Sequence, residues 1–261
     1  MPELPDVEIF RRYAEKHALS QEIQDVSIKD DKIAATSPQT LKKSLTGHQL
    51  KKAGRVGKYL FLPTEGETVL VMHFGMTGWL EYQKQEEVQY AKASLHFDSG
   101  YYLHFVNPRK LGRLHITDNI QEFSRYMQIG PDALAIREED FLQKMKKKKG
   151  MLKSALMDQS FLSGIGNIYS DEIFFQAGLH PKTKISNLNE AQLGNLFIRM
   201  KEVLSLAIEQ RADPENMPEH FIIPRRKEGS SCPSCGGEVR KDKLSGRGFY
   251  YCPRCQGGKS D

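Results

Sequence analysis

Residues 161–181, FLSGIGNIYSDEIFFQAGLHP, carry the most informative local pattern in the chain. The run Ser163–Gly166 is typical of a turn, and Asn167 is a good N-cap for the helix expected to follow it. Gly178 is suited to end that helix, with Pro181 just beyond. A glycine-rich turn before a helix gathers free backbone N–H groups, which favour an anion such as phosphate. Many helix–helix corners share this pattern, so alone it is weak evidence of a phosphate site.

Helical spacing extends to both sides of this segment, from about residue 120 onward. The expected helices span 121–128, 138–147, 151–159, 167–177 and 189–211. Within them, Asp171 and Glu172 are interpreted as helix N-terminal charges, which the helix dipole favours. This half of the chain is therefore predicted to form a helical domain.

The first half of the chain has short runs of β-branched, leucine and aromatic residues instead. The expected strands lie in VGKYLFL (56–62), ETVLVMHF (67–74), SLHFDSGYYLHFV (94–106) and GRLHIT (112–117). One helix is expected over residues 5–18, begun by Pro5, and another near residues 38–45. These patterns predict a β-rich domain of the sandwich or barrel type.

All four cysteines lie near the C-terminus, as CPSC at 232–235 and CPRC at 252–255. The spacing C-x2-C-x16-C-x2-C predicts one zinc ion held by four thiolates. Two disulfides or a redox pair are the alternatives, which a cytoplasmic location disfavours. Four thiolates leave no open coordination position, so the role would be structural. Between the knuckles, two strands joined by a turn at Ser245–Gly246 would present Arg247, a residue type that forms paired hydrogen bonds to phosphate.

The charge of the chain is concentrated at its C-terminal end. From Pro224 onward there are nine lysines and arginines against four acids, which leaves 9 − 4 = +5, the net charge of the whole chain. A basic tail on a neutral body favours a polyanionic partner, most often nucleic acid, although a merely solubilising tail has the same composition. There is no apolar run long enough to span a bilayer and no signal-peptide pattern. We therefore expect a cytoplasmic protein.

The chain begins MPELPDVEIF, which allows two interpretations. It is either the lead-in to a helix or a chemical device, since removal of Met1 would expose the secondary amine of Pro2. An α-amino group has an ordinary pKa near ~8, so more of it is neutral at pH 7 than of a lysine side chain.

Several motifs occur together in one order along nearly the full chain. They are MPELPDVE, GKYLFL, HFGMTG, NPRKLGRL, GIGNIYSDEIFFQAGLHP and GRGFYYCPRCQ. This set resembles the formamidopyrimidine-DNA glycosylase / endonuclease VIII family of base-excision repair enzymes. The resemblance implies an α+β multidomain fold: an N-terminal β-sandwich with flanking helices (1–119), a helix–two-turn–helix domain (120–223) and a zinc-ribbon β-hairpin finger (224–261).

The resemblance also implies a bifunctional DNA glycosylase and abasic-site lyase that acts on damaged double-stranded DNA, as a monomer, in the cytoplasm and at the nucleoid. The nucleophile would be Pro2, its proton-transfer partner Glu3, and the lysine beside the scissile phosphate Lys58. The residues implied to contact DNA are Met76, Arg109, Asn167 and Arg247. The implied ligands of one structural zinc ion are Cys232, Cys235, Cys252 and Cys255.

Four departures from the family pattern bear on activity. Asp6 stands where glutamate is usual, Leu111 replaces a common phenylalanine, and Tyr90–Ala93 replaces a His-Asp-His stretch. The short linker between Arg211 and Cys232 weakens the expectation of 8-oxoguanine preference and favours oxidised pyrimidines, ring-opened purines or abasic sites. A lesion-binding protein without efficient cleavage is the main alternative, and an RNA-binding zinc-ribbon protein is a weaker one.

Overall fold

A computed structural model describes residues 1–257 of the chain, which divide into two compact units. Unit 1 spans Met1–Gln128, and unit 2 begins at Ile129. The finer domain boundaries expected at 119/120 and 223/224 stay a prediction. None of the helices within residues 1–257 combines the length and the apolar character needed to cross a bilayer.

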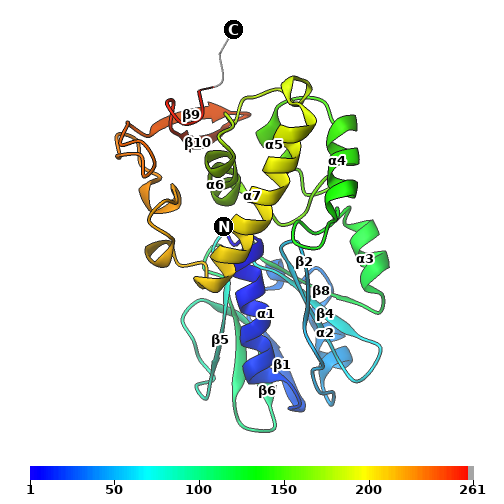
Figure 1. Cartoon of the computed structure of the whole chain (residues 1–261). Coiled ribbons are helices and arrows are strands. Elements are labelled where there is room, and N and C mark those ends of the chain that lie inside the picture. Colours follow the sequence, from blue (N-terminus) through cyan, green and yellow to red (C-terminus); the bar gives the residue numbers. More distant parts are fainter. Residues whose placement is uncertain (258–261) are drawn as a thin grey trace. The chain divides into compact units, whose positions relative to one another are not determined.

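Unit 1 is a sandwich of two four-stranded antiparallel sheets, as expected (Figure 1). One sheet has the strand order β1-β6-β7-β5 and the other β2-β3-β4-β8. The strands are β1 (Ile23–Ile28), β2 (Gly54–Val56), β3 (Tyr59–Pro63), β4 (Val69–His73), β5 (Trp79–Gln83), β6 (Ala91–Phe97), β7 (Tyr102–Val106) and β8 (Arg113–Thr117). The sheets form because alternate side chains of each strand face a shared apolar interior.

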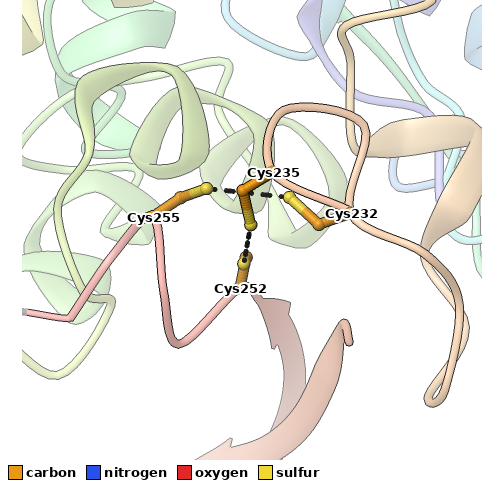
Figure 2. A group of neighbouring side chains, drawn as sticks. All are labelled: Cys232, Cys235, Cys252 and Cys255. Carbon is orange, nitrogen blue, oxygen red and sulfur yellow. Dashed lines mark hydrogen bonds between the residues drawn. The ribbon is translucent and has the colours of Figure 1, made fainter. Parts of the chain in front are cut away.

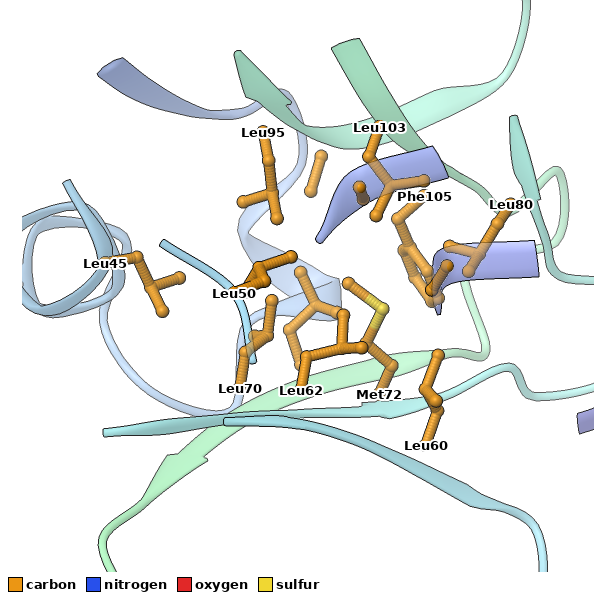
Figure 3. Packing of buried hydrophobic residues seen from close by; sticks show 14 of the residues in the cluster. Leu45, Leu50, Leu60, Leu62, Leu70, Met72, Leu80, Leu95, Leu103 and Phe105 are labelled. Carbon is orange, nitrogen blue, oxygen red and sulfur yellow. The ribbon is translucent and has the colours of Figure 1, made fainter. Parts of the chain in front are cut away.

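The core of unit 1 lies between these sheets (Figure 3). Leu60, Leu70 and Met72 from one sheet pack in the same cluster as Leu103 and Phe105 from the other, and all five are nearly or fully buried. At about 25 cal/mol per Å² of apolar surface removed from water, such burial is the main source of stability. It gives the loops at the strand ends a rigid support.

Three helices accompany the sandwich: α1 (Leu4–Ala18), α2 (Pro38–Leu45) and α3 (Ile120–Tyr126). The bounds of α2 match the prediction because Ser37 caps its first turn, accepting from Thr40 N at 3.2 Å. Gly57 and Lys58 were expected inside a strand but form the turn between β2 and β3. Gly57 has φ +57°, which a β-strand does not contain.

Unit 2 is helical, with a small hairpin at its end. Its helices are α4 (Glu138–Lys147), α5 (Leu152–Met157), α6 (Asn167–Ala177) and α7 (Glu190–Glu209). The bounds of α4 and α6 match the prediction, whereas α5 and α7 are shorter than expected at both ends. Gly178 ends α6 in the left-handed conformation, with φ +67°, as predicted.

The zinc-ribbon hairpin consists of β9 (Arg240–Leu244) and β10 (Arg247–Tyr251). Ser245 and Gly246 form its two-residue turn, with φ +49° and +76°, the signs that a tight hairpin turn requires. A separate small core joins this module to α6 through Phe175, Cys232, Val239 and Cys252. The α+β fold with sandwich, helical and finger parts is thus confirmed.

Candidate active site and nucleic-acid interface

The amino terminus leads directly into a buried carboxylate. Glu3 is 1% exposed and is the N-cap residue of α1, while Pro2 before it is half-buried. The Glu3 backbone N–H donates to Oδ2 of Asp6 at 2.8 Å. This bond fixes the conformation of the chain between Pro2 and the first turn of the helix, so the direction of the terminus is set locally.

Asp6 is the unusual acid of this site. Burial, opposed by the hydrogen bond from the Glu3 backbone and assisted by the negative charge of the Glu3 side chain, raises the pKa of Asp6 to about 6. Two carboxyl groups therefore lie together beside the proposed nucleophile. Asp6 gains or loses its proton close to neutral pH.

Lys58 lies in the β2–β3 turn and is only 6% exposed. The turn is braced by Arg55, whose Nη1 donates to the Gly57 carbonyl at 3.0 Å. The same guanidinium donates through Nε to Oε2 of Glu8 in α1 at 3.2 Å. The Lys58 turn is therefore tied to the helix that carries Pro2 and Glu3.

Glu8 is ionised, so it binds Arg55 as a carboxylate. Burial opposes its ionisation, but hydrogen bonds and charges from Arg11, Arg12 and Arg55 prevail and hold its pKa below the usual range. Arg11 approaches Glu8 at 2.8 Å and Arg12 at 3.1 Å.

His73, at the end of β4, is neutral at physiological pH. Burial lowers its pKa to about 4, with a further contribution from the positive charge of Lys58. A neutral histidine gives phosphate no ionic attraction, so His73 is better suited to packing within the sheet, where its ring lies tilted against that of Tyr59 with ring centroids 4.9 Å apart.

Met76 and Arg109 lie on two loops that one buried side chain joins. Asn107 donates from Nδ2 to the Phe74 carbonyl at 2.9 Å, and its Oδ1 accepts from Leu111 N at 3.0 Å. Met76 is 40% exposed, and Arg109 is also exposed. The structure thus places both predicted gap-filling residues at one edge of unit 1.

In unit 2, Asn167 lies at the start of α6, but it is not the N-cap that the sequence predicted. Gly166 occupies the N-cap position in an extended conformation, without a side-chain cap. The Asn167 side chain instead donates from Nδ2 to the carbonyl of Gly248 at 2.9 Å, next to Arg247. The prediction was wrong because the Asn167 side chain donates to a distant carbonyl of the finger and makes no capping bond to α6. The bond brings two proposed phosphate-binding positions together.

Asp171 organises the contact between the helices and the finger. It is fully buried and accepts from Lys153 Nζ at 2.6 Å, from Arg226 Nη2 at 2.7 Å and from the backbone N–H of Tyr250 at 3.0 Å. The prediction of a helix N-terminal charge was wrong, because Asp171 lies beyond the first turn of α6 and is paired with Lys153 and Arg226. No local pattern marks this network, since its partners are distant in sequence.

Glu172 was also predicted to be a helix N-terminal charge, but it lies beyond the first turn of α6 and is fully buried. Its Oε2 accepts from Ile223 N at 2.8 Å, and its Oε1 accepts from Gln176 Nε2 at 2.8 Å. Burial outweighs these hydrogen bonds and raises the pKa of Glu172 to about 7. Glu172 thus fixes the segment that leads into the finger.

The four cysteine sulfurs converge in unit 2 (Figure 2). The Sγ atoms of Cys232 and Cys255 are 3.7 Å apart, those of Cys235 and Cys252 are 3.5 Å apart, and all four lie within 4.8 Å of one another. Zn–S bonds of about 2.3 Å place tetrahedral sulfurs roughly 3.8 Å apart. Disulfide sulfurs would lie only about 2.05 Å apart. The set therefore fits one structural zinc ion, as predicted, and not two disulfides.

Three family models match successive parts of the chain. They are the formamidopyrimidine-DNA glycosylase N-terminal domain over residues 1–114, the H2TH domain of the same enzymes over 129–217, and the zinc finger found in FPG and IleRS over 229–257. The order matches the sandwich, helices and finger described above.

Whole-chain comparisons agree with these matches. Formamidopyrimidine-DNA glycosylases of Heliobacterium modesticaldum and Thermus thermophilus are 33% and 32% identical, with 98% of this chain and 100% and 99% of theirs covered. Two structures of the Lactococcus lactis enzyme, bound to DNA containing FAPY-dG and to DNA containing an AP site, superpose with a TM-score of 0.90. Their identities are 28% and 29%, with 98% of this chain and 100% of theirs covered. The chain thus belongs to the formamidopyrimidine-DNA glycosylase family.

Proposed function

We propose that the protein removes damaged bases from DNA through its own amino terminus, with the Pro2 amine as the nucleophile. Its relatives are named formamidopyrimidine-DNA glycosylases, and base-excision DNA glycosylase activity with abasic-site lyase activity is the function of that family. The observation that carries the proposal is the hydrogen bond, directly after Pro2, from the backbone of the buried Glu3 to the half-buried carboxylate of Asp6.

The chemistry needs an amine that is nucleophilic and can become an electron sink. The Pro2 nitrogen attacks C1′ of the damaged nucleotide, the bond from C1′ to the base breaks, and the base leaves with its electron pair and takes up a proton. The sugar ring opens, and a secondary amine gives a cationic iminium without losing a second N–H proton. The iminium acidifies the C2′ hydrogen, so loss of that proton expels the 3′ phosphate. A second elimination releases the 5′ phosphate.

Glu3 moves protons in this scheme. Removal of Met1 leaves it the second residue of the chain, within reach of the sugar oxygens and of the Pro2 nitrogen. Asp6 holds the Glu3 backbone at 2.8 Å and carries a pKa of about 6, so its charge state changes the field at Glu3 near neutral pH. Asp6 is therefore a positioning residue with an electrostatic effect.

Binding of the DNA backbone is assigned to cations and amides. Lys58 neutralises the phosphate beside the reacting sugar, and Asn167 and Arg247 bind a second phosphate in unit 2. Met76 and Arg109 fill the gap that the everted base leaves, which offsets part of the unstacking cost of a few kcal/mol.

The finer points of the proposal are duplex DNA as substrate, action as a monomer, and a cytoplasmic location with access to the nucleoid. Four thiolates kept reduced for zinc agree with such a location. The Lactococcus lactis relative has been solved in complex with oxidised-pyrimidine DNA and in complex with FAPY-dG DNA. We therefore include ring-opened purines, oxidised pyrimidines and abasic sites among the substrates.

The alternative is a lesion-binding protein that cleaves weakly. The substitution of Asp6 for the usual glutamate favours it, because a shorter acid beside Glu3 alters the proton-transfer site. This alternative predicts strong binding to abasic DNA without a covalent adduct.

Borohydride trapping on abasic-site duplex separates the two. Protein confirmed by mass to begin at Pro2 should form a reduced covalent adduct. The same protein carrying a blocking N-terminal extension should form none, because its Pro2 nitrogen is an amide. Lys58→Gln should lower the adduct yield sharply, whereas Lys43→Gln, at an exposed lysine of α2, should leave it unchanged. Binding without an adduct from processed protein would favour the alternative.

A further inference from the structure

Three of the large apolar side chains that unit 1 exposes to water belong to three loops around one edge of the sandwich. Met76 follows β4, Tyr90 precedes β6 and Leu111 precedes β8, and their exposures are 40%, 49% and 50%. Exposed apolar side chains that gather in one place indicate a binding surface. The proposed function uses Met76 and leaves Tyr90 without a role.

The buried residue Asn107 holds these loops together. Its side chain binds the backbones of Phe74 and Leu111, and its own backbone N–H donates to the Tyr90 carbonyl at 3.0 Å. The loops also touch directly, since a Cβ added to Gly75 would lie 2.5 Å from the carbonyl carbon of Leu111. The backbones at Met76, Tyr90 and Leu111 are thus parts of one rigid edge.

The backbone of Tyr90 is strained. Its φ is +64°, a value that glycine and asparagine tolerate better than an aromatic residue. Strained residues persist where the surrounding structure fixes them, and they gather at functional positions. A glycine would give the same turn without strain, so what tyrosine adds here is the half-exposed ring.

We propose that Tyr90 is a DNA-facing residue whose ring stacks on a nucleobase beside the lesion. The inference rests on the proposed function, because it requires bound damaged DNA. The exposed cations Arg109 and Arg113 flank Leu111, beside Lys110, which is paired with Asp30 at 2.7 Å, so this edge suits a polyanion. We assign a nucleobase as the group that contacts Tyr90, because every base offers a flat π face to an aromatic ring. Leucine at 111 lacks such a face, and Tyr90 supplies it from the neighbouring loop.

The test uses full-length protein and duplex DNA with a tetrahydrofuran abasic analogue and 2-aminopurine as the base beside it. Tyr90→Ala should weaken binding about tenfold, the scale of losing one stacked base, and should change the 2-aminopurine emission of the complex. Tyr90→Phe should keep both properties, because the ring is retained. Tyr126→Ala, at an aromatic residue 85% exposed in α3, is the matched control and should bind as wild type does.

Tyr90→Gly is the control for loss of the folded state. It removes the aromatic ring and the backbone strain together. It should unfold at the same or a higher temperature than wild type, yet bind as weakly as Tyr90→Ala. Wild-type affinity in Tyr90→Ala would overturn the inference. Equal losses in Tyr90→Phe and Tyr90→Ala would also overturn stacking, because they would assign the contact to the hydroxyl. If wild-type protein itself failed to bind lesion DNA, the proposed function would fail first.

Discussion

The amino-terminal site and the finger region are held in place by different physical means. Pro2, Glu3 and Asp6 are positioned by one helix turn, with support from the short turn at Lys58. Asn167 and Arg247 depend on contacts between residues far apart in sequence, centred on Asp171 and on four cysteines. Substitutions in the first region should therefore change chemistry and leave the fold intact, whereas those in the second should loosen the scaffold itself.

Metal removal is expected to give the largest effect. Structural zinc contributes on the order of 10 kcal/mol or more to folding of finger peptides, so chelation or Cys252→Ser should unfold residues 229–257. Hydrogen-exchange mass spectrometry should show lost protection there and unchanged protection in unit 1. DNA affinity should fall with the finger and return when zinc is restored to the chelated wild type. If the finger stayed protected without metal, the claim that the four cysteines hold this region in place would be contradicted.

Asp171→Asn should have the next largest effect. It leaves Lys153 and Arg226 without their carboxylate partner in a buried site, and such losses cost about 3–5 kcal/mol. The free energy of unfolding of unit 2, measured by urea titration, should fall accordingly. Glu202→Gln removes the exposed ion pair with Arg199 on α7 and serves as the control, with a change under about 1 kcal/mol. Equal effects of the two substitutions would count against the organising role of Asp171.

Asp6 gives a pH-dependent effect in the first region. Because folding raises its pKa from 3.8 to about 6, the native state holds this proton more tightly than the unfolded chain. The resulting stability is present below about pH 4 and is lost as pH rises through about 6, by at most about 3 kcal/mol. Asp6→Asn should remove this component, which is measured as the difference between the two stability–pH curves. Parallel curves from pH 4 to 7 would show that Asp6 titrates normally.

Arg247→Ala should have the smallest effect. Losing one phosphate contact should weaken DNA binding roughly tenfold and make the slope of log affinity against log salt shallower by about 1. Arg240→Ala, at the opposite end of the same hairpin, is the control and should change both quantities less. A salt slope unchanged by Arg247→Ala would remove this residue from the phosphate contacts.

The sequence predicted features that depend on near neighbours in the chain. The C-terminal end of α6 followed from Gly178, and the zinc ligands followed from two Cys-x-x-Cys pairs. Strands β1 and β5 were not singled out, because their apolar patterns are short and mixed with polar residues. Local propensity is a poor predictor of strands such as these, because pairing with strands distant in sequence stabilises them.

Long-range contacts explain the remaining errors at the site. Asn167 has the chemistry of an N-cap, but a carbonyl of the finger binds its side chain instead. Asp171 was interpreted as a helix N-terminal charge, but the fold brings Lys153 and Arg226 beside it. Neither partner is within a helical turn in sequence, so no periodicity could reveal them.

The central claim is that the amine of Pro2 reacts with C1′ of the damaged nucleotide. The most direct measurement is peptide mapping of the borohydride-reduced complex by mass spectrometry. The sugar remnant should be attached to the nitrogen of Pro2 in the N-terminal peptide of protein lacking Met1. Attachment to Lys58 or to any other lysine, with Pro2 unmodified, would contradict it.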